Sequence, residues 1–153
     1  MTKYQKKTLV VFVGLLLMLG FSAVSFNFVT QEMKTSSPSA IGRVVQGTDK
    51  ATVVVFKRHG CPDCRSVQTL VKMGAFSQKT VFVEATSKDD QQYFKRFGVR
   101  HTPTFMILKQ GQPQILWRDH GRPVRMYSGT DRKKIKKIFG IRPTVIAAGW
   151  LHV

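Results

Sequence analysis

Acidic residues are scarce in this sequence. Only 8 aspartates and glutamates stand against 25 lysines and arginines, which gives a formal net charge of +17. A field of that sign favours anionic partners such as nucleic acid, anionic lipid or an acidic cell-wall polymer. The basic residues are scattered, however, and no signature for base or phosphate recognition is present. We therefore expect no nucleic-acid partner and interpret the charge as a solvated basic surface suited to an anionic envelope.

Cysteine is also scarce, because the chain has only Cys61 and Cys64, three positions apart. A structural disulfide framework usually needs more cysteines with wider loops, so this class is excluded. A lone close pair indicates thiol–disulfide exchange, a structural disulfide, or half of a zinc site that His59 and His101 would complete. Structural zinc sites usually show two recognisable ligand pairs. We therefore expect no metal, and no cofactor beyond a redox-active Cys61–Cys64 disulfide.

Charge is absent from residues 9–26, an apolar run of 18 residues. A helix of that length spans about 27 Å, close to the ~30 Å hydrocarbon core of a membrane. We predict a basic tip over residues 1–8, a transmembrane anchor over 9–29 and a flexible polar stalk over 30–40. Lysines before the run place the N-terminus in the cytoplasm and the remainder outside. The alternative is a cleaved signal peptide, which would export the domain equally.

The remaining chain alternates β-branched runs with amphipathic segments, and contains no internal repeat. We predict strands over 51–56, 80–85 and 104–108, weaker strands over 115–118 and 124–127, and helices over 62–76, 89–97 and 130–139. This order predicts an α/β fold, a mixed sheet flanked by helices, over residues 41–140. Residues 141–153 form an apolar tail without an assigned structure.

The cysteine pair follows the first strand and opens the first helix of this domain. A helix N-terminus presents unpaired N–H groups and a partial positive charge, which lower the pKa of a cysteine there. We therefore expect Cys61 to be the nucleophile. Cys64, one turn later on the same side, is expected to resolve the mixed disulfide.

Residues around the pair are expected to tune it. Pro62 suits the first helical position, where its missing N–H has no cost. Asp63 opposes formation of the thiolate. The basic neighbours favour the thiolate: Lys57, Arg58, Arg65 and, when protonated, His59.

Four segments resemble the thioredoxin family: residues 52–56, the Cys61–Cys64 motif, residues 97–105 and residues 109–111. The resemblance covers about residues 44–139 and implies a thioredoxin fold with protein thiol or disulfide substrates. It also implies a cis peptide bond between Thr102 and Pro103 that faces the cysteines. By the same resemblance, Thr102, Pro103 and Gly129 border the bound substrate chain.

The chain also departs from the family pattern. Val55 stands where the family often has a buried acid, and Gly60 replaces the usual tryptophan before the first cysteine. Glu84 could supply a carboxylate, but we expect a solvated residue at a strand end. The leading hypothesis is an extracytoplasmic, membrane-anchored thiol–disulfide oxidoreductase with an unknown redox partner. The alternative, by analogy of architecture, is a non-catalytic adaptor of a bacterial secretion, conjugation or bacteriocin machine.

Overall fold

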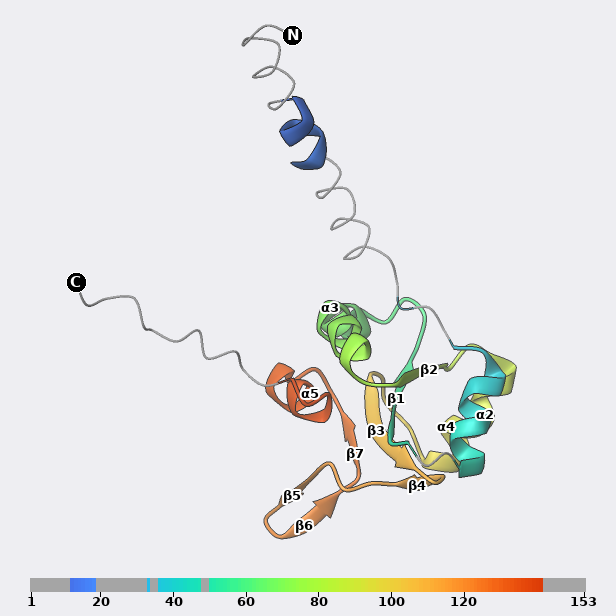
Figure 1. Cartoon of the computed structure of the whole chain (residues 1–153). Coiled ribbons are helices and arrows are strands. Elements are labelled where there is room, and N and C mark those ends of the chain that lie inside the picture. The colour runs from blue at the N-terminus through green and yellow to red at the C-terminus, as the bar shows by residue number, and fades with distance from the viewer. Residues whose placement is uncertain (1–11, 19–32, 34–35, 48–49, 142–153) are drawn as a thin grey trace, which may run out of the picture. The chain divides into compact units, whose positions relative to one another are not determined.

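The computed structural model describes residues 12–18, Met33, residues 36–47 and residues 50–141 (Figure 1). The chain divides into two compact units, Met1–Glu32 and Met33–Val153. In the first unit, residues 12–18 are helical. Among the described residues, no helix combines the length and the apolar character needed to cross a membrane. The predicted basic tip, most of the predicted anchor and nearly all of the C-terminal tail lie outside the described residues.

The second unit is built around a five-stranded mixed sheet. Its strands are β1 (Thr52–Lys57), β2 (Thr80–Glu84), β3 (Thr104–Lys109), β4 (Gln112–Pro113) and β7 (Met126–Ser128). Strand β1 pairs with β2 in parallel and with β3 in antiparallel orientation. Strands β4 and β7 both pair with β3 in antiparallel orientation, β4 at its end and β7 at its start.

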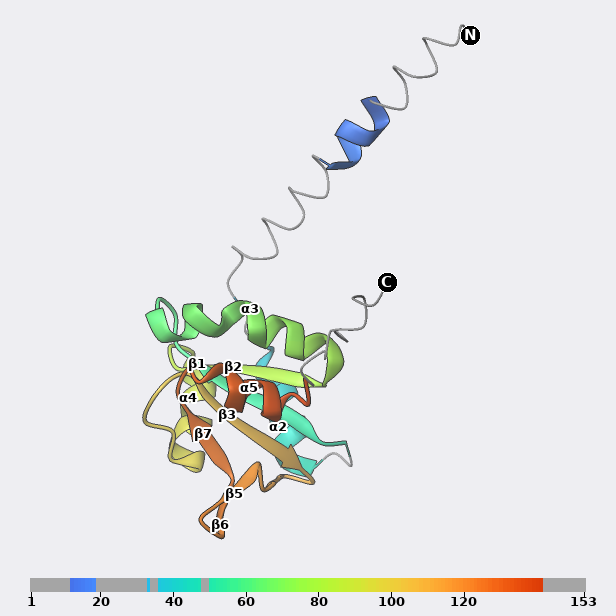
Figure 2. The same cartoon turned by 90° about the vertical axis from the view of Figure 1, so that its left-hand side faces the viewer.

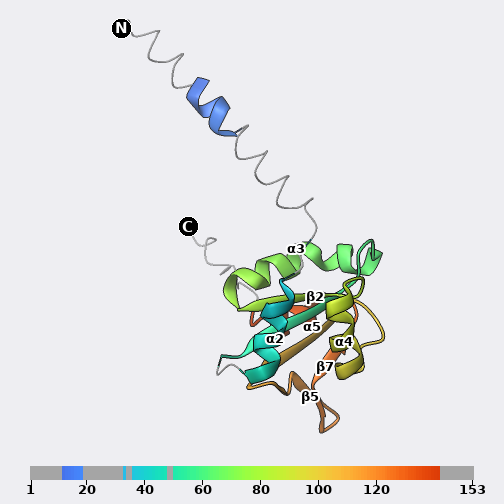
Figure 3. The ribbon, with the colours of Figure 1, turned by 90° about the vertical axis from the view of Figure 1, so that its right-hand side faces the viewer.

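Helices cover both faces of this sheet. They are α2 (Pro38–Gly47), α3 (Pro62–Ser77), α4 (Lys88–Phe97) and α5 (Arg132–Ile138). Helices α3 and α5 lie on one face, and α2 and α4 lie on the other (Figure 1, Figure 3). This arrangement confirms the predicted mixed sheet with helices on it.

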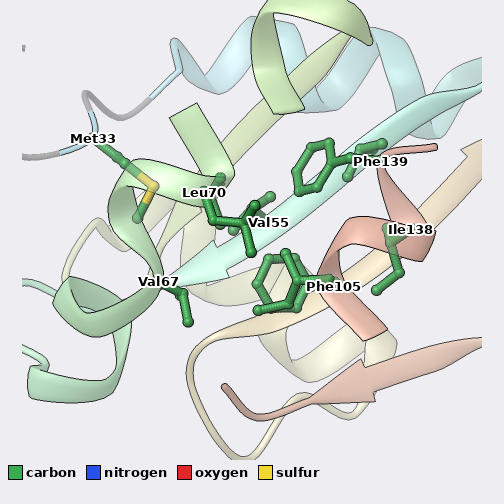
Figure 4. Packing of buried hydrophobic residues seen from close by; sticks show 10 residues of the cluster. Met33, Val55, Val67, Leu70, Phe105, Ile138 and Phe139 are labelled. Carbon is green, nitrogen blue, oxygen red and sulfur yellow. The ribbon is translucent and has the colours of Figure 1, made fainter. Parts of the chain in front are cut away.

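Strand β1 forms the centre of the core because all six of its residues are buried. Successive side chains of a strand point to opposite faces. Val53 and Val55 accordingly join the core under α3 and α5, whereas Val54 and Phe56 join the core under α2 and α4. Figure 4 shows Val55 surrounded by side chains from α3, β3 and the end of α5. Packing on both faces fixes the end of β1, from which the chain runs to Cys61.

Helices α3 and α5 meet where Gly74 lies against the ring of Phe139. A Cβ atom built at Gly74 would lie 2.3 Å from Cγ of Phe139, closer than two carbon atoms can approach. The ring itself is buried and packs edge-on against Phe105 of β3. Because position 74 has no side chain, α3 can pack directly against the ring of Phe139.

Replacing Gly74 by alanine should therefore destabilise the domain, although alanine favours helices. We expect the free energy of unfolding to fall by about 1–3 kcal/mol, the usual cost of an overpacked core. Urea denaturation followed by circular dichroism measures this change. Ala75→Gly, at the adjacent half-buried position, shows the effect of the reverse exchange away from the Phe139 ring. An unchanged urea midpoint for Gly74→Ala would contradict the packing.

The predicted flexible stalk over residues 30–40 is wrong for its described part. Met33 is buried in the core under α3, and the backbone N–H of Ser36 donates to the carbonyl oxygen of Phe82 at 3.0 Å. Helix α2 begins at Pro38 and buries Ile41 and Val44 against the sheet. The polar, glycine-containing sequence concealed this helix, because tertiary packing overrides weak local propensity.

The predicted strands over 115–118 and 124–127 are wrong in their boundaries. Strands β5 (Trp117–Asp119) and β6 (Arg122–Val124) form a separate two-stranded sheet, which projects from the domain (Figure 1, Figure 2). Of β5, β6 and β7, it is β7 that pairs with β3 and belongs to the main sheet. Helix α5 begins at Arg132 rather than at 130 because the Asp131 side chain caps it, accepting from the N–H of Lys133 at 2.8 Å.

Candidate active site

The loop between β1 and α3 brings Cys61 to the start of a helix. Gly60 has φ +67°, a left-handed conformation that side chains rarely adopt, and it lets the chain turn from the strand into the helix. Cys61 itself has extended backbone angles and is the N-cap residue of α3. Pro62 follows at the first helical position, as predicted. The sequence thus places one sulfur atom at the exposed N–H groups of a helix end.

The sulfur of Cys61 has three polar neighbours. Its Sγ accepts from the backbone N–H of Cys64 at 3.3 Å, and Thr102 Oγ1 donates to it at 3.5 Å. As a thiol, Cys61 can instead donate to the carbonyl oxygen of Thr102, 3.6 Å away. Both cysteines are free thiols in this structure. Two donors therefore converge on Cys61 and can stabilise a negative charge on its sulfur.

These contacts separate the acidities of the two thiols. Burial, the largest single influence, raises the pKa of Cys61. Hydrogen bonds from the Thr102 side chain, from Cys64 and from the backbone of Asp63 together lower it below its ordinary value of 9.0. For Cys64, burial and, to a smaller extent, the neighbouring Cys61 together raise the pKa to about 11 against the opposing backbone hydrogen bond of Arg58. Near neutral pH, Cys61 is therefore the better nucleophile and Cys64 stays protonated.

Exposure separates the two cysteines much less. Cys61 is 5% exposed and Cys64 is 4% exposed. Cys61 nevertheless lies between Gly60 and Pro62, which are both exposed. Acidity, rather than accessibility, distinguishes the two roles.

A second loop faces the cysteines across the site. The peptide bond between Thr102 and Pro103 is cis, as the family resemblance implied. Thr102 contacts the sulfur of Cys61, and the carbonyl oxygen of Pro103 accepts from the N–H of Gly129 at 3.0 Å. Residues from three separate parts of the sequence, Cys61, Thr102 with Pro103, and Gly129, are therefore neighbours at one end of the sheet.

The predicted tuning residues surround the pair at the surface. His59, Asp63 and Arg65 are exposed, and so is His101. The strongest influences that lower the pKa of Cys61 are hydrogen bonds, not the neighbouring cations that the sequence suggested. Among the described residues, no group of three or more histidine, cysteine or acidic side chains is arranged to hold a metal ion.

Sequence reasoning missed an ion pair next to this site. Lys57 Nζ contacts Glu84 Oε2 at 2.6 Å, with only 7% and 13% of the two side chains exposed. The expectation that Glu84 is solvated is therefore wrong. Lys57 and Glu84 are paired in register at the ends of β1 and β2, so their side chains share a face of the sheet with Val55. A lysine directly after five buried strand residues was the available signal.

Asp90 of α4 extends this buried polar group. It is 1% exposed, and its Oδ2 accepts from the backbone N–H of Glu84 at 2.9 Å. Its Oδ1 has no hydrogen-bond partner among the described residues. Burial, and then the charges of Asp89 and Glu84, raise the pKa of Asp90 against the opposing effects of the Glu84 amide and Lys57. Lys57 thus supplies positive charge to both Glu84 and Asp90.

Replacing Thr102 by valine tests the hydrogen bond to Cys61. Without the hydroxyl donor, the pKa of Cys61 should rise toward its ordinary value. Because the thiolate fraction grows as pH passes the pKa, its titration curve should shift to higher pH. The ultraviolet absorbance of the thiolate measures this curve, with Thr86→Val, at an exposed threonine after β2, as the control. Identical curves for both variants and the wild type would contradict the assignment.

The comparisons with known proteins agree with this geometry. Residues 32–137 match the family model described as Thioredoxin, and no curated protein matches the chain. Thioredoxin NaTrxh from Nicotiana alata has a similar structure, with a TM-score of 0.52 and 21% identity over 74% of this chain and 99% of that one. The reduced thioredoxin pre-protein of Schistosoma mansoni gives 0.51 and 20% over 71% and 93%. With more than half of its length matched by the family model, this chain belongs to the thioredoxin family of thiol–disulfide oxidoreductases.

Proposed function

We propose that this chain is a membrane-anchored thiol–disulfide oxidoreductase that acts on protein substrates outside the cytoplasm, with Cys61 as the nucleophile and Cys64 as the resolving cysteine. One observation carries the chemical part of the proposal. Two hydrogen-bond donors, the N–H of Cys64 and the hydroxyl of Thr102, converge on the sulfur of Cys61. The pKa of Cys61 is lowered, whereas that of Cys64 is raised to about 11.

In the proposed reduction, the Cys61 thiolate attacks one sulfur of a substrate disulfide. The substrate S–S bond breaks, a Cys61–substrate disulfide forms, and the departing sulfur takes up a proton. Cys64 then loses its proton and attacks Cys61, which releases the second substrate thiol. Two electrons pass from the protein dithiol to the substrate, and the protein ends with a Cys61–Cys64 disulfide. A dithiol must reduce it again, and the same steps in reverse oxidise a substrate.

The raised pKa of Cys64 determines the order in which the two cysteines react. A protonated Cys64 does not compete with Cys61 for the substrate disulfide. Once Cys61 is part of the mixed disulfide, its negative charge no longer opposes ionisation of Cys64. Cys64 then becomes easier to deprotonate at the moment when its attack is needed.

The loop at Thr102 and Pro103 is the proposed docking site for the substrate backbone. Thr102 is half-buried and touches the nucleophile, and Gly129 lies beside Pro103. A substrate chain laid along these residues would bring its disulfide to Cys61 in a fixed orientation.

The proposed location rests on the sequence. Residues 9–26 carry no charge, and lysines precede them, which favours a single-pass anchor with a cytoplasmic N-terminus. Protease treatment of intact cells and of inverted membrane vesicles tests this orientation. We expect the domain to be digested only from the outer side, and digestion only from the inner side would contradict the location.

Reduction of insulin by dithiothreitol tests the chemistry, with the full-length chain in detergent as catalyst. The wild type should accelerate the reaction, and Cys61→Ser should lower the rate to that of dithiothreitol alone. Ser66→Ala, an exposed change on the same helix, is the matched control and should keep the wild-type rate. Equal rates for the wild type and Cys61→Ser would remove the proposal.

A further inference from the structure

The two loops that meet at Cys61 carry the same pair of residue types, an arginine followed by a histidine. Arg58 and His59 precede the first cysteine, and Arg100 and His101 precede Thr102. All four side chains are exposed. Because Thr102 contacts the sulfur of Cys61 at 3.5 Å, the loop that carries Arg100 and His101 meets the loop that carries Arg58 and His59 at the nucleophile. Together with the exposed Arg65 of α3, they form a basic rim around the site.

The arginines of this rim are not used inside the protein. Within the part of the chain that the structure describes, the guanidinium groups of Arg58, Arg65 and Arg100 form no ion pair or hydrogen bond. Two exposed acidic residues, Asp63 and Asp131, lie at the N-terminal ends of α3 and α5. Asp63 lies in the first turn of α3, and the carboxylate of Asp131 accepts from two backbone amides of α5. The positive charge of these three guanidinium groups is therefore left for a group from outside.

The chemistry of the site determines what that group belongs to. A chain whose disulfide reaches Cys61 comes close to the loops that carry Arg58 and Arg100, because these loops meet at the sulfur. Aspartate and glutamate side chains near that disulfide would meet guanidinium groups, whose planar forks match carboxylates. Opposite charges at the rim of an interface also accelerate encounter and disfavour partners of the wrong sign. Lysines and arginines beside the disulfide would be repelled.

We propose that the basic rim selects protein disulfides that are flanked by acidic residues. This inference rests on the proposed function, since it names the class of substrate for the same cysteine pair. It assigns the three arginines to substrate choice, and leaves the bond-forming steps with Cys61 and Cys64.

Three disulfide-bonded peptides test the inference. They share one sequence except at the positions beside the cysteines, which are glutamate, glutamine or lysine. The full-length chain in detergent, with dithiothreitol as the final reductant, is assayed for kcat/KM on each. At about 0.01 M salt we expect the glutamate peptide to react roughly three- to thirtyfold faster than the lysine peptide, as a few exposed ion pairs allow. Near 1 M salt, where charges are screened beyond about 3 Å, this ratio should approach one.

Two charge-matched variants locate the effect. The combined variant Arg58→Gln, Arg65→Gln and Arg100→Gln should bring the ratio close to one at low salt. The control removes three exposed cations elsewhere, with Lys109→Gln at the far end of β3 and Arg118→Gln and Arg122→Gln in the β5–β6 hairpin. It should keep the wild-type ratio.

The outcomes separate the two proposals. Equal rates on all three peptides would overturn the inference and leave the proposed function intact. A ratio that falls equally in both variants would also overturn it, because net charge rather than the rim would be responsible. Failure to reduce any peptide would remove the proposed function and the inference together.

Discussion

Replacing Cys64 by alanine should make the protein accumulate as a mixed disulfide with its substrate. Cys61 keeps its position at the N-cap of α3 and its hydrogen bond from Thr102, so the first attack still occurs. The backbone N–H of Cys64, which also stabilises the thiolate, remains present in alanine. The second step has no resolving thiol, and turnover should therefore fall to the uncatalysed rate.

Non-reducing electrophoresis and peptide mapping measure this accumulation. The mixed disulfide should involve Cys61 alone, and a reducing agent should release it. The mirror variant, Cys61→Ala, is the control and should form far less adduct, because burial, the largest influence on Cys64, still raises its pKa when Cys61 is absent. Equal adduct formation by both variants would contradict the separate roles of the two cysteines.

Replacing Lys57 by methionine should cause a large loss of stability. The change removes the ammonium group that lies 2.6 Å from the carboxylate of Glu84, a side chain that is only 13% exposed. Asp90, which is 1% exposed, would share that unbalanced environment. Removal of one partner from a buried ion pair typically costs about 3–5 kcal/mol, because the other charge remains buried and uncompensated.

Urea denaturation at neutral pH measures this loss. Lys79→Met, at an exposed lysine just before β2, is the matched control and should change the free energy of unfolding by less than about 0.5 kcal/mol. Adding Glu84→Leu to Lys57→Met should restore much of the stability, since an apolar pair can replace a buried ionic one. A loss equal to that of the control would show that the pair carries little of the fold.

The part of the fold nearest the chemistry could be predicted because several local signals agree there. A run of buried β-branched residues, then Cys61 and Pro62 at a helix start, specifies strand, loop and helix without reference to the rest of the chain. The cis bond at Pro103 followed from resemblance to a family, and no local rule would have supplied it.

The remainder depends on contacts between distant segments. Met33 and Ser36 belong to the domain only because the core under α3 and the edge of β2 receive them. In the same way, Lys57 finds Glu84 through the register of two parallel strands, 27 residues apart. The residues next to Lys57 or Glu84 in the sequence do not indicate that the two side chains meet. Local sequence patterns therefore did not predict the ion pair, although they drew attention to Lys57 and Glu84 separately.

Alkylation of the reduced wild-type chain at a series of pH values tests the central claim most directly. Mass spectrometry assigns the label to each cysteine. Cys61 should react with a midpoint below pH 9.0, and Cys64 should remain unlabelled until the pH approaches about 11. Coincident midpoints, or earlier labelling of Cys64, would contradict the assignment of Cys61 as the activated sulfur.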